Sequence, residues 1–419
     1  MEINIFGAGK EVGRSAIYVK TGKTNILMDY GTMFSDGEPK FPMHIPPREI
    51  DAIILSHAHL DHSGAIPIFY ITEKPKLITT QLTAEISELL IQDFIHLSSY
   101  YLPYENLELR YMMKSVRPIS LKDNFTINEV KVKTLNAGHI PGSIMTMIEA
   151  DNKRILYTGD LNTIDTKLLK GATKKLPKLD AIIIEGTYAT TNHEERRKTE
   201  KELVSTVKDV VDNQGIALIP AFAVGRSQEI LCILQEAKVK GQTYLDGMAR
   251  KASSIMLKYP QYLRSSKLFT RAHEKAIWIK SWSDRRKACK KPSIIVTPAG
   301  MLKGGNVRFY MKKLARNENN GVFLVSYQIP GTPGAILLEN GTYNFGKRSE
   351  RVKAKIGWFD FSSHCGREQL IEILEKNKIS KIILVHGEKE KLETFQKELL
   401  EKKIGEEVIV PENGDKIRI

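Results

Sequence analysis

The sequence has few cysteines, no long apolar segment and no signal-peptide pattern. Its three cysteines, Cys232, Cys289 and Cys365, are odd in number and far apart, which argues against a disulfide framework and favours a reducing compartment. No stretch approaches the uninterrupted apolar length of a membrane span, and no basic segment followed by an apolar one opens the chain. We therefore expect a cytoplasmic globular protein, and 419 residues are enough for two domains.

Acidic residues are scarce relative to basic residues in only one part of the chain, residues 190–361. The net charge is +14, and residues 190–361 hold 31 lysines and arginines against 15 aspartates and glutamates, a net +16. The rest of the chain is close to neutral. A positive excess confined to one segment favours a surface that binds a polyanion, although a basic run is more often only a solvated face.

The most basic part of this segment, residues 264–291, also carries aromatic side chains. Charges that meet phosphates and rings that meet bases are what single-stranded nucleic acid requires. The alternative, which the sequence leaves open, is that the rings are core residues of a basic helical region. The cations and rings are Arg271, Lys275, Lys280, Arg285, Arg286, Lys287, Lys290 and Lys291, with Phe269, Trp278 and Trp282.

Histidine is also scarce, with ten in the chain, yet three lie within six positions. His57, His59, Asp61 and His62 follow an apolar, isoleucine-rich run, residues 51–56, that predicts a short buried strand. Imidazoles at a rigid strand end can converge on zinc, and a carboxylate adds charge for a second metal. A lone histidine is usually a satisfied structural residue, but this cluster predicts a metal site.

Four further candidate ligands stand in similar places. His139, Asp160 and His386 each follow an apolar run and lie beside a glycine, and Asp29 has the same placement. Taken singly, each is more often a turn residue. Their repeated position at predicted strand ends favours one shared site.

The middle of the chain alternates strand, glycine-containing loop and helix, the pattern of a parallel α/β sheet. Strands are predicted at 215–220, 293–297 and 322–326, and a helix at about 228–237. Loops at the carboxyl ends of such strands form ligand sites, and their backbone amides suit phosphate. The three loops are 222–227, 298–305 and 331–334.

Taken together, the motifs resemble the metallo-β-lactamase superfamily, and within it the β-CASP nucleases. The superfamily pattern is His57-x-His59-x-Asp61-His62, then Gly138-His139, then Gly159-Asp160. The β-CASP residues are Glu185, His364 and His386. The resemblance implies an αββα sandwich (residues 1–189 and 362–419) with an inserted β-CASP domain built on a parallel α/β sheet (190–361).

The resemblance also implies a role for each residue. Two Zn2+ ions would bind, one to His57, His59 and His139, the other to Asp61, His62 and His386, with Asp160 bridging. Asp29 would orient ligand histidines. Glu185 and His364 would act in catalysis beside Asp61. RNA phosphates would bind the inserted domain at Arg226, Ser227, Ser326, Gly331, Thr332 and Gly334.

Histidine at position 386 matches the RNA-acting members of the group, because DNA-repair members carry an aliphatic residue there. Gly13-Arg14-Ser15 and Val385-His386-Gly387-Glu388 are most similar to archaeal relatives of the cleavage and polyadenylation specificity factor endonuclease. We therefore expect a zinc-dependent ribonuclease that cuts single-stranded RNA by two-metal activation of water. Products would be a 5′-phosphate and a 3′-hydroxyl, as in 3′-end processing or decay.

Sequence alone does not separate an endonuclease from a 5′→3′ exonuclease, nor a monomer from a homodimer or a complex with other RNA-processing subunits. Two further readings remain open. A small-substrate hydrolase of the same superfamily would share the metal ligands, but it would not need a basic insertion. A non-catalytic scaffold would typically have lost part of the ligand set.

Overall fold

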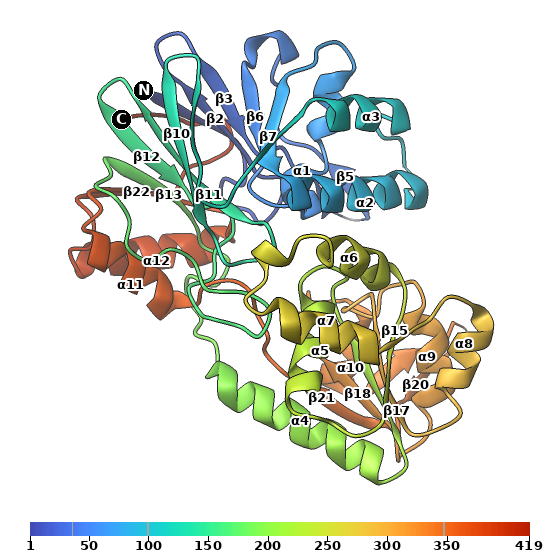
Figure 1. Ribbon diagram of the computed structural model, residues 1–419. Coiled ribbons are helices and arrows are strands. Elements are labelled where there is room, and N and C mark those ends of the chain that lie inside the picture. Colours follow the sequence, from blue (N-terminus) through green and yellow to red (C-terminus); the bar gives the residue numbers. More distant parts are fainter. Residues whose placement is uncertain (36, 99, 347) are drawn as a thin grey trace. The chain divides into compact units, whose positions relative to one another are not determined.

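The computed structural model describes residues 1–35, 37–98, 100–346 and 348–419. These residues form two compact units (Figure 1). The first consists of residues 1–165, 171–192 and 363–419, and the second of residues 166–170 and 193–362. The second unit is therefore an insertion in the sequence of the first.

The first unit contains two seven-stranded sheets of mixed direction. In spatial order, the first sheet is β24 (Lys416–Arg418), β1 (Glu2–Gly7), β2 (Ala16–Lys20), β3 (Asn25–Met28), β6 (Ala52–Ile54), β7 (Lys76–Thr80) and β8 (Val116–Ile119). The second is β23 (Glu407–Ile409), β22 (Lys381–Val385), β13 (Ala181–Glu185), β12 (Lys153–Tyr157), β11 (Ile144–Ala150), β10 (Val130–Asn136) and β9 (Asn124–Ile127). A small hairpin, β4 (Met33–Ser35) with β5 (Glu38–Lys40), stands apart from both sheets.

The two sheets pack face to face, and helices cover their outer faces. The side-chain alternation of a strand explains how β13, which is buried along its whole length, serves both layers. Ile183 packs into the core between the sheets, whereas Ile182 and Ile184 pack against the helices behind the second sheet. The unit is thus the four-layer αββα sandwich predicted from the resemblance.

Each outer layer has its own apolar core. Behind the second sheet lie α11 (Arg367–Asn377) and α12 (Lys389–Glu401), which contribute Leu374 and Phe395 to that core. Behind the first sheet lie α1 (Leu60–Ser63), α2 (Gln81–Leu97) and α3 (Asn106–Lys114), with Phe94 and Met112 buried beneath them.

The second unit is built on a six-stranded sheet in which every pairing is parallel. This confirms the predicted parallel α/β sheet of the insertion. In spatial order its strands are β16 (Ile277–Trp278), β15 (Gln242–Leu245), β17 (Ser293–Thr297), β14 (Ile216–Pro220), β18 (Gly321–Leu324) and β21 (Lys355–Trp358). A hairpin of β19 (Thr342–Asn344) and β20 (Ser349–Arg351) is separate.

Helices pack on both faces of this sheet. Ile216 and Leu218 of β14 face a core that includes Met311 and Leu337, from α9 (Val307–Leu314) and α10 (Pro333–Asn340). The other helices are α4 (Arg196–Asp212), α5 (Arg226–Glu236), α6 (Met248–Met256), α7 (Ser266–Lys275) and α8 (Trp282–Ala288). Of these, α4 and α5 contact the central strands β14 and β17.

The last two strands join different sheets of the first unit. β23 pairs in parallel with β22, and β24 pairs antiparallel with β1. These two strands therefore complete both sheets of the first unit within one chain. Among the described residues, no helix is both long and apolar enough to cross a membrane.

Candidate metal centre

The predicted ligands stand where strands of the first unit end. Asp29 follows β3, and residues 57–62 run from the end of β6 into α1. Asp160 follows β12, Glu185 ends β13 and His386 follows β22, three neighbouring parallel strands. Carboxyl ends of parallel strands meet at one edge of a sheet, which is why residues far apart in sequence come together here.

Asp160 occupies the middle of the cluster. Its Oδ2 lies 3.4 Å from His57 Nε2 and 3.6 Å from His139 Nε2. Its Oδ1 lies 3.3 Å from His62 Nε2 and 3.4 Å from His386 Nδ1. One carboxylate thus turns one oxygen toward each of two groups of donors.

The two groups share only Asp160. In each, all donor atoms lie within 4.8 Å of one another. His59 Nδ1 lies 3.1 Å from His139 Nε2 in the first group, and Asp61 Oδ2 lies 3.4 Å from His386 Nε2 in the second. The first group is His57, His59, His139 and Asp160; the second is Asp61, His62, Asp160 and His386.

These separations fit metal ions better than direct hydrogen bonds. Ligands at about 2.0–2.2 Å from a tetrahedral zinc are about 3.3–3.6 Å apart. Among the described residues, the buried atoms His57 Nε2, Asp160 Oδ1 and His386 Nε2 have no hydrogen-bond partner, and such atoms are costly unless something coordinates them. The donor set therefore supports metal binding.

Burial sets the protonation of the first group. It lowers the pKa of His57 well below the usual value, with the neighbouring His62 adding to the effect. Burial likewise lowers the pKa of His139 well below the usual value, and His364 adds to it. Both imidazoles are therefore neutral at physiological pH, the form in which histidine binds a metal.

Asp29 lies behind the cluster and is fully buried. Its Oδ2 accepts hydrogen bonds from His62 Nδ1 at 2.7 Å and from the Tyr157 hydroxyl at 2.8 Å. The Ser56 backbone N–H and hydroxyl donate to its two oxygens, both at 2.7 Å. With its Nδ1 proton held by Asp29, His62 presents Nε2 to the cluster.

Glu185 and His364 form a pair beside Asp160. His364 Nδ1 lies 2.9 Å from both carboxylate oxygens of Glu185. Burial lowers the pKa of His364, but the charges of Glu185 and Asp160 outweigh it and raise this pKa to about 9. His364 is therefore protonated near neutrality and can donate a proton. Asp160, Glu185 and His364 also form a third group of close donors.

Three side chains that sequence reasoning missed hold this arrangement together. Tyr157 and Ser56 bind Asp29, and Thr187 donates to Glu185 while its hydroxyl lies 3.2 Å from His386 Nδ1. Ser56 and Thr187 are within two residues of a predicted site residue, which was a usable signal. Tyr157 reaches Asp29 across 128 positions, and nothing local in the sequence indicates that contact.

The predicted phosphate-binding residues lie in the second unit, at the carboxyl ends of β14 and β18. A Cβ built on Gly300, in the loop after β17, would lie 3.0 Å from Ser326 Oγ and 3.4 Å from the carbonyl carbon of Ala221. The three glycine loops therefore converge at one edge of the sheet. Gly331 lies in the loop before α10, and nothing lies within 4 Å of a Cβ built on it.

Four of these residues also make internal contacts. Arg226 is buried and paired with Glu229 at 3.1 Å, and Ser227 donates to the Phe222 carbonyl. Thr332 caps the N-terminus of α10, and Gly334 donates its N–H to the Met301 carbonyl.

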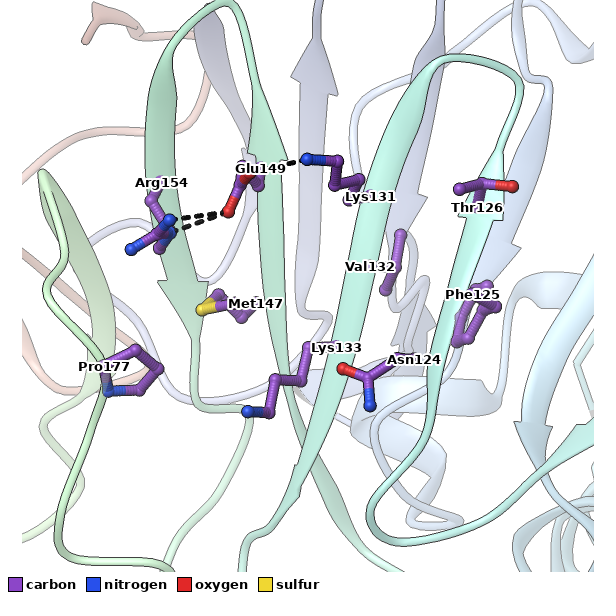
Figure 2. A pocket seen from close by; sticks show the side chains of 10 residues that line it. All are labelled: Asn124, Phe125, Thr126, Lys131, Val132, Lys133, Met147, Glu149, Arg154 and Pro177. Carbon is purple, nitrogen blue, oxygen red and sulfur yellow. Dashed lines mark hydrogen bonds and ion pairs between the residues drawn. The ribbon is translucent and has the colours of Figure 1, made fainter.

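A surface hollow of about 560 Å³ lies elsewhere, over β9–β12 (Figure 2). Lys131, Lys133 and Arg154 line it with Glu149, to which both Lys131 and Arg154 are bonded. None of its lining residues belongs to the cluster around Asp160. The hollow is therefore separate from the metal centre.

The αββα sandwich, the double donor cluster and the inserted parallel sheet together define a metallo-hydrolase. Three family descriptions match the chain: the metallo-beta-lactamase superfamily at residues 9–204, the Beta-Casp domain at 227–337 and the Zn-dependent metallo-hydrolase RNA specificity domain at 349–411. The chain belongs to the β-CASP family of the metallo-β-lactamase superfamily.

The chain is similar in sequence to several named archaeal proteins. The chain is 41% identical to RNase aCSPSF2 of Saccharolobus solfataricus, over all of this chain and 85% of the relative. It is 36% identical to Probable RNase MJ4 of Methanocaldococcus jannaschii over the full length of both. It is 32% identical to Transcription termination factor FttA of the same organism, over 100% of this chain and 72% of that protein.

A solved structure supports the fold alone. A protein of unknown function from Enterococcus faecalis V583 is similar with a TM-score of 0.63 and 16% identity, over 99% of each chain.

Proposed function

We propose that this protein is a zinc-dependent ribonuclease that hydrolyses phosphodiester bonds of single-stranded RNA and leaves a 5′-phosphate and a 3′-hydroxyl. The observation that carries the proposal is the placement of Asp160, which turns one oxygen toward each of two donor groups and lies beside the Glu185–His364 pair. Its similarity to proteins named RNase and to a named termination factor supports RNA as the substrate.

Two zinc ions would supply Lewis acidity, which acidifies water and offsets charge on the phosphate. In this proposal His57, His59 and His139 would hold one ion, Asp61, His62 and His386 would hold the other, and Asp160 would be a ligand shared by both. Asp29 holds the His62 ring in position through its 2.7 Å hydrogen bond.

His364 is proposed as the general acid. Water loses a proton to solvent and attacks phosphorus, the bond to the 3′ oxygen breaks, and His364 gives that oxygen its proton. The leaving group departs as a 3′-hydroxyl, and the attacking oxygen stays on the 5′-phosphate. The raised pKa of His364, about 9, keeps the proton available at neutral pH. Glu185 orients the ring through its 2.9 Å contact with Nδ1.

The basic second unit is proposed to hold the RNA strand. Residues 190–361 carry all of the positive excess of the chain. The loops that contain Arg226, Ser227, Ser326, Gly331, Thr332 and Gly334 lie at the carboxyl edge of a parallel sheet, where phosphate-binding loops are typically found. We also propose a cytoplasmic location, to which the three free cysteines are suited.

The experiment compares a circular single-stranded RNA with the same RNA in linear, 5′-monophosphorylated form, using zinc-loaded protein and the His364→Ala variant as the control. Cleavage of the circle identifies an endonuclease of 3′-end formation or termination. An intact circle with the linear form shortened from its 5′ end identifies an exonuclease of RNA decay.

Failure to cut either RNA while zinc is bound would contradict the proposal. The small-substrate hydrolase and the non-catalytic scaffold would then be the remaining readings. Sedimentation of the same preparations, with and without RNA, tests whether a homodimer or another RNA-processing subunit takes part.

A further inference from the structure

Of the aromatic residues in the basic stretch 264–291, only one is largely open to solvent. Phe269 is buried, and Trp278 is half-buried with its Nε1–H donated to the His273 carbonyl at 3.0 Å. Trp282, the first residue of α8, is 55% exposed. An indole this exposed has a large apolar surface available for contact with a base.

Two neighbours hold the Trp282 ring. The Arg285 guanidinium lies over one face, 4.7 Å from the ring centroid. Phe309 of α9 meets the ring at 76°, with centroids 5.5 Å apart. Beside these two contacts, 55% of Trp282 stays exposed.

Arg285 is itself fixed by a buried carboxylate. Asp246, at the end of β15, accepts hydrogen bonds from Arg285 Nε at 2.7 Å and Nη2 at 3.0 Å. The Tyr310 hydroxyl and the Gly247 N–H donate to the same carboxylate, at 2.8 Å and 2.6 Å. A bidentate pair of this kind fixes the plane of the guanidinium. The Trp282 ring therefore rests on a rigid support.

Cations accompany the ring on both helices. Arg286 lies one turn after Trp282 on α8, and Lys313 lies one turn after Phe309 on α9, the spacing that places side chains on one face. Both are exposed, and the described part of the chain offers neither an acidic partner at ion-pair distance. Figure 1 shows α8 and α9 side by side. Free cations around an open ring match a strand of phosphates and bases.

The Asp246–Arg285 pair that supports the ring lies next to one of the glycine loops, residues 298–305. A Cβ built on Gly247, next to Asp246, would lie 3.0 Å from Pro298, the first residue of the loop after β17. That loop in turn meets Ser326 through Gly300. The ring and the proposed phosphate-binding loops therefore lie along one continuous edge of the sheet.

We propose that the exposed surface of the Trp282 ring is a stacking platform for a base of single-stranded RNA, with Arg286 and Lys313 binding the adjacent phosphates. This inference rests on the proposed function and adds a second, base-reading contact outside the metal centre. Stacking accepts any base, so the platform contributes affinity without a strict sequence preference.

The experiment measures the affinity of a fluorescein-labelled single-stranded RNA of about 12 nucleotides at several salt concentrations. The His364→Ala background prevents cleavage. Trp282→Ala should weaken binding by about 5- to 100-fold, the loss of one base stack, and Trp282→Phe should keep most of the affinity. Tyr101→Ala, which removes an 89% exposed ring of the first unit, is the matched control and should bind like the parent.

Salt dependence separates stacking from charge. Trp282→Ala removes no phosphate contact, so the slope of log affinity against log salt should not change. Arg286→Ala and Lys313→Ala should each reduce that slope by about 0.7. With His364 restored, Trp282→Ala should hydrolyse bis(p-nitrophenyl) phosphate at the parent rate, because the metal centre is untouched.

Equal RNA affinity of Trp282→Ala and its parent, in a protein that binds and cuts RNA, would overturn the platform and leave the proposed function standing. A protein that neither binds nor cuts RNA would overturn both. Equal losses in Trp282→Ala and Tyr101→Ala would also overturn the platform. So would a changed oligomeric state at unchanged RNA affinity, which would make Trp282 a protein contact.

Discussion

At the scale of single residues, the cluster around Asp160 contains two kinds of side chain: the candidate metal ligands, and the Glu185–His364 pair beside them. His59 Nδ1 lies 3.1 Å from another candidate ligand, whereas His364 Nδ1 is occupied by Glu185. The two histidines should therefore respond differently to substitution.

His59→Ala should lose both metal and RNA cleavage, because it removes a donor. His364→Ala should keep the metal and lose about 100-fold or more in cleavage rate, the usual contribution of a general acid. Metal content by atomic absorption, measured beside single-turnover cleavage, checks both. Loss of metal from His364→Ala would reassign that histidine as a ligand.

Tyr157→Phe tests the support behind Asp29. The variant keeps the ring and removes only the hydroxyl that donates to Asp29 Oδ2 at 2.8 Å. Removing such a partner typically weakens metal affinity about 10- to 100-fold. Competition with a chelator measures this affinity. Tyr343→Phe, at a buried tyrosine of the second unit, is the control and should not change it.

Much of the donor set could be predicted from the sequence because its members end apolar runs. Residues 57–62 are adjacent in sequence, and His139, Asp160 and His386 each follow a strand. The pairing of one Asp160 oxygen with each donor group could not be predicted, because it depends on the pairing of strands whose partner residues lie 200 positions apart.

At the scale of elements, the turn that carries Asp61 and His62 leaves no space beneath it. A Cβ on Gly31 would lie 1.8 Å from the Asp61 carbonyl oxygen and 2.5 Å from the His62 nitrogen, both backbone atoms. The loop after β3 and the start of α1 therefore fit together only if position 31 has no side chain.

Gly31→Ala should displace two ligands at once, and we expect it to lower metal affinity and to destabilise the fold by about 1–3 kcal/mol. Calorimetry and metal titration measure the two effects. Gly304→Ala is the matched control, since nothing lies within 4 Å of a Cβ built there. Equal behaviour of the two variants would contradict the close fit at Gly31.

Helices α6 and α7 share a buried histidine that predicts a pH effect. His273 Nδ1 donates to the Phe269 carbonyl at 2.8 Å, and its Nε2 lies 2.9 Å from Ser253 Oγ. Burial, only partly opposed by the bond to Phe269, lowers the pKa of His273 to about 4. Below its usual pKa of about 6.5, the unfolded chain therefore binds a proton that the folded chain does not.

Stability should fall by up to about 3 kcal/mol as the pH drops from about 6.5 to 4, and His273→Gln should remove that part of the dependence. Urea unfolding of both proteins across this range gives the difference. The histidines of the metal centre titrate in both proteins, so their contribution cancels in the difference between the two free energies of unfolding. An equal pH dependence of the free energy of unfolding in both proteins would contradict the assignment of this effect to His273.

Strongly patterned elements could be predicted closely from the sequence. The strand predicted at 293–297 is β17, and the helix predicted at 228–237 is α5, which begins two residues earlier. Short edge strands such as β8 and β9 were not predicted, because their residues are mostly exposed and lack a continuous apolar pattern. Pairing with a neighbour forms these strands more than propensity does.

At the scale of the whole molecule, all proposed metal ligands belong to the first unit and all of the excess positive charge to the inserted segment. Metal removal should therefore act on one unit. A chelator should lower the unfolding temperature of the first unit, because bound metal stabilises only the folded state. Calorimetry with and without zinc measures this shift. A shift of the second unit instead would place the metal elsewhere.

The insertion also fixes an order of events on the ribosome. β13 pairs in parallel with β22, and residues 193–362 of the second unit are encoded between them. Until these residues have been translated, the nascent first unit lacks both His364 and His386, and the apolar β13 lacks one of its two neighbouring strands. With the roles proposed for His364 and His386, the protein would gain its cutting activity only after nearly all of its own message has been read.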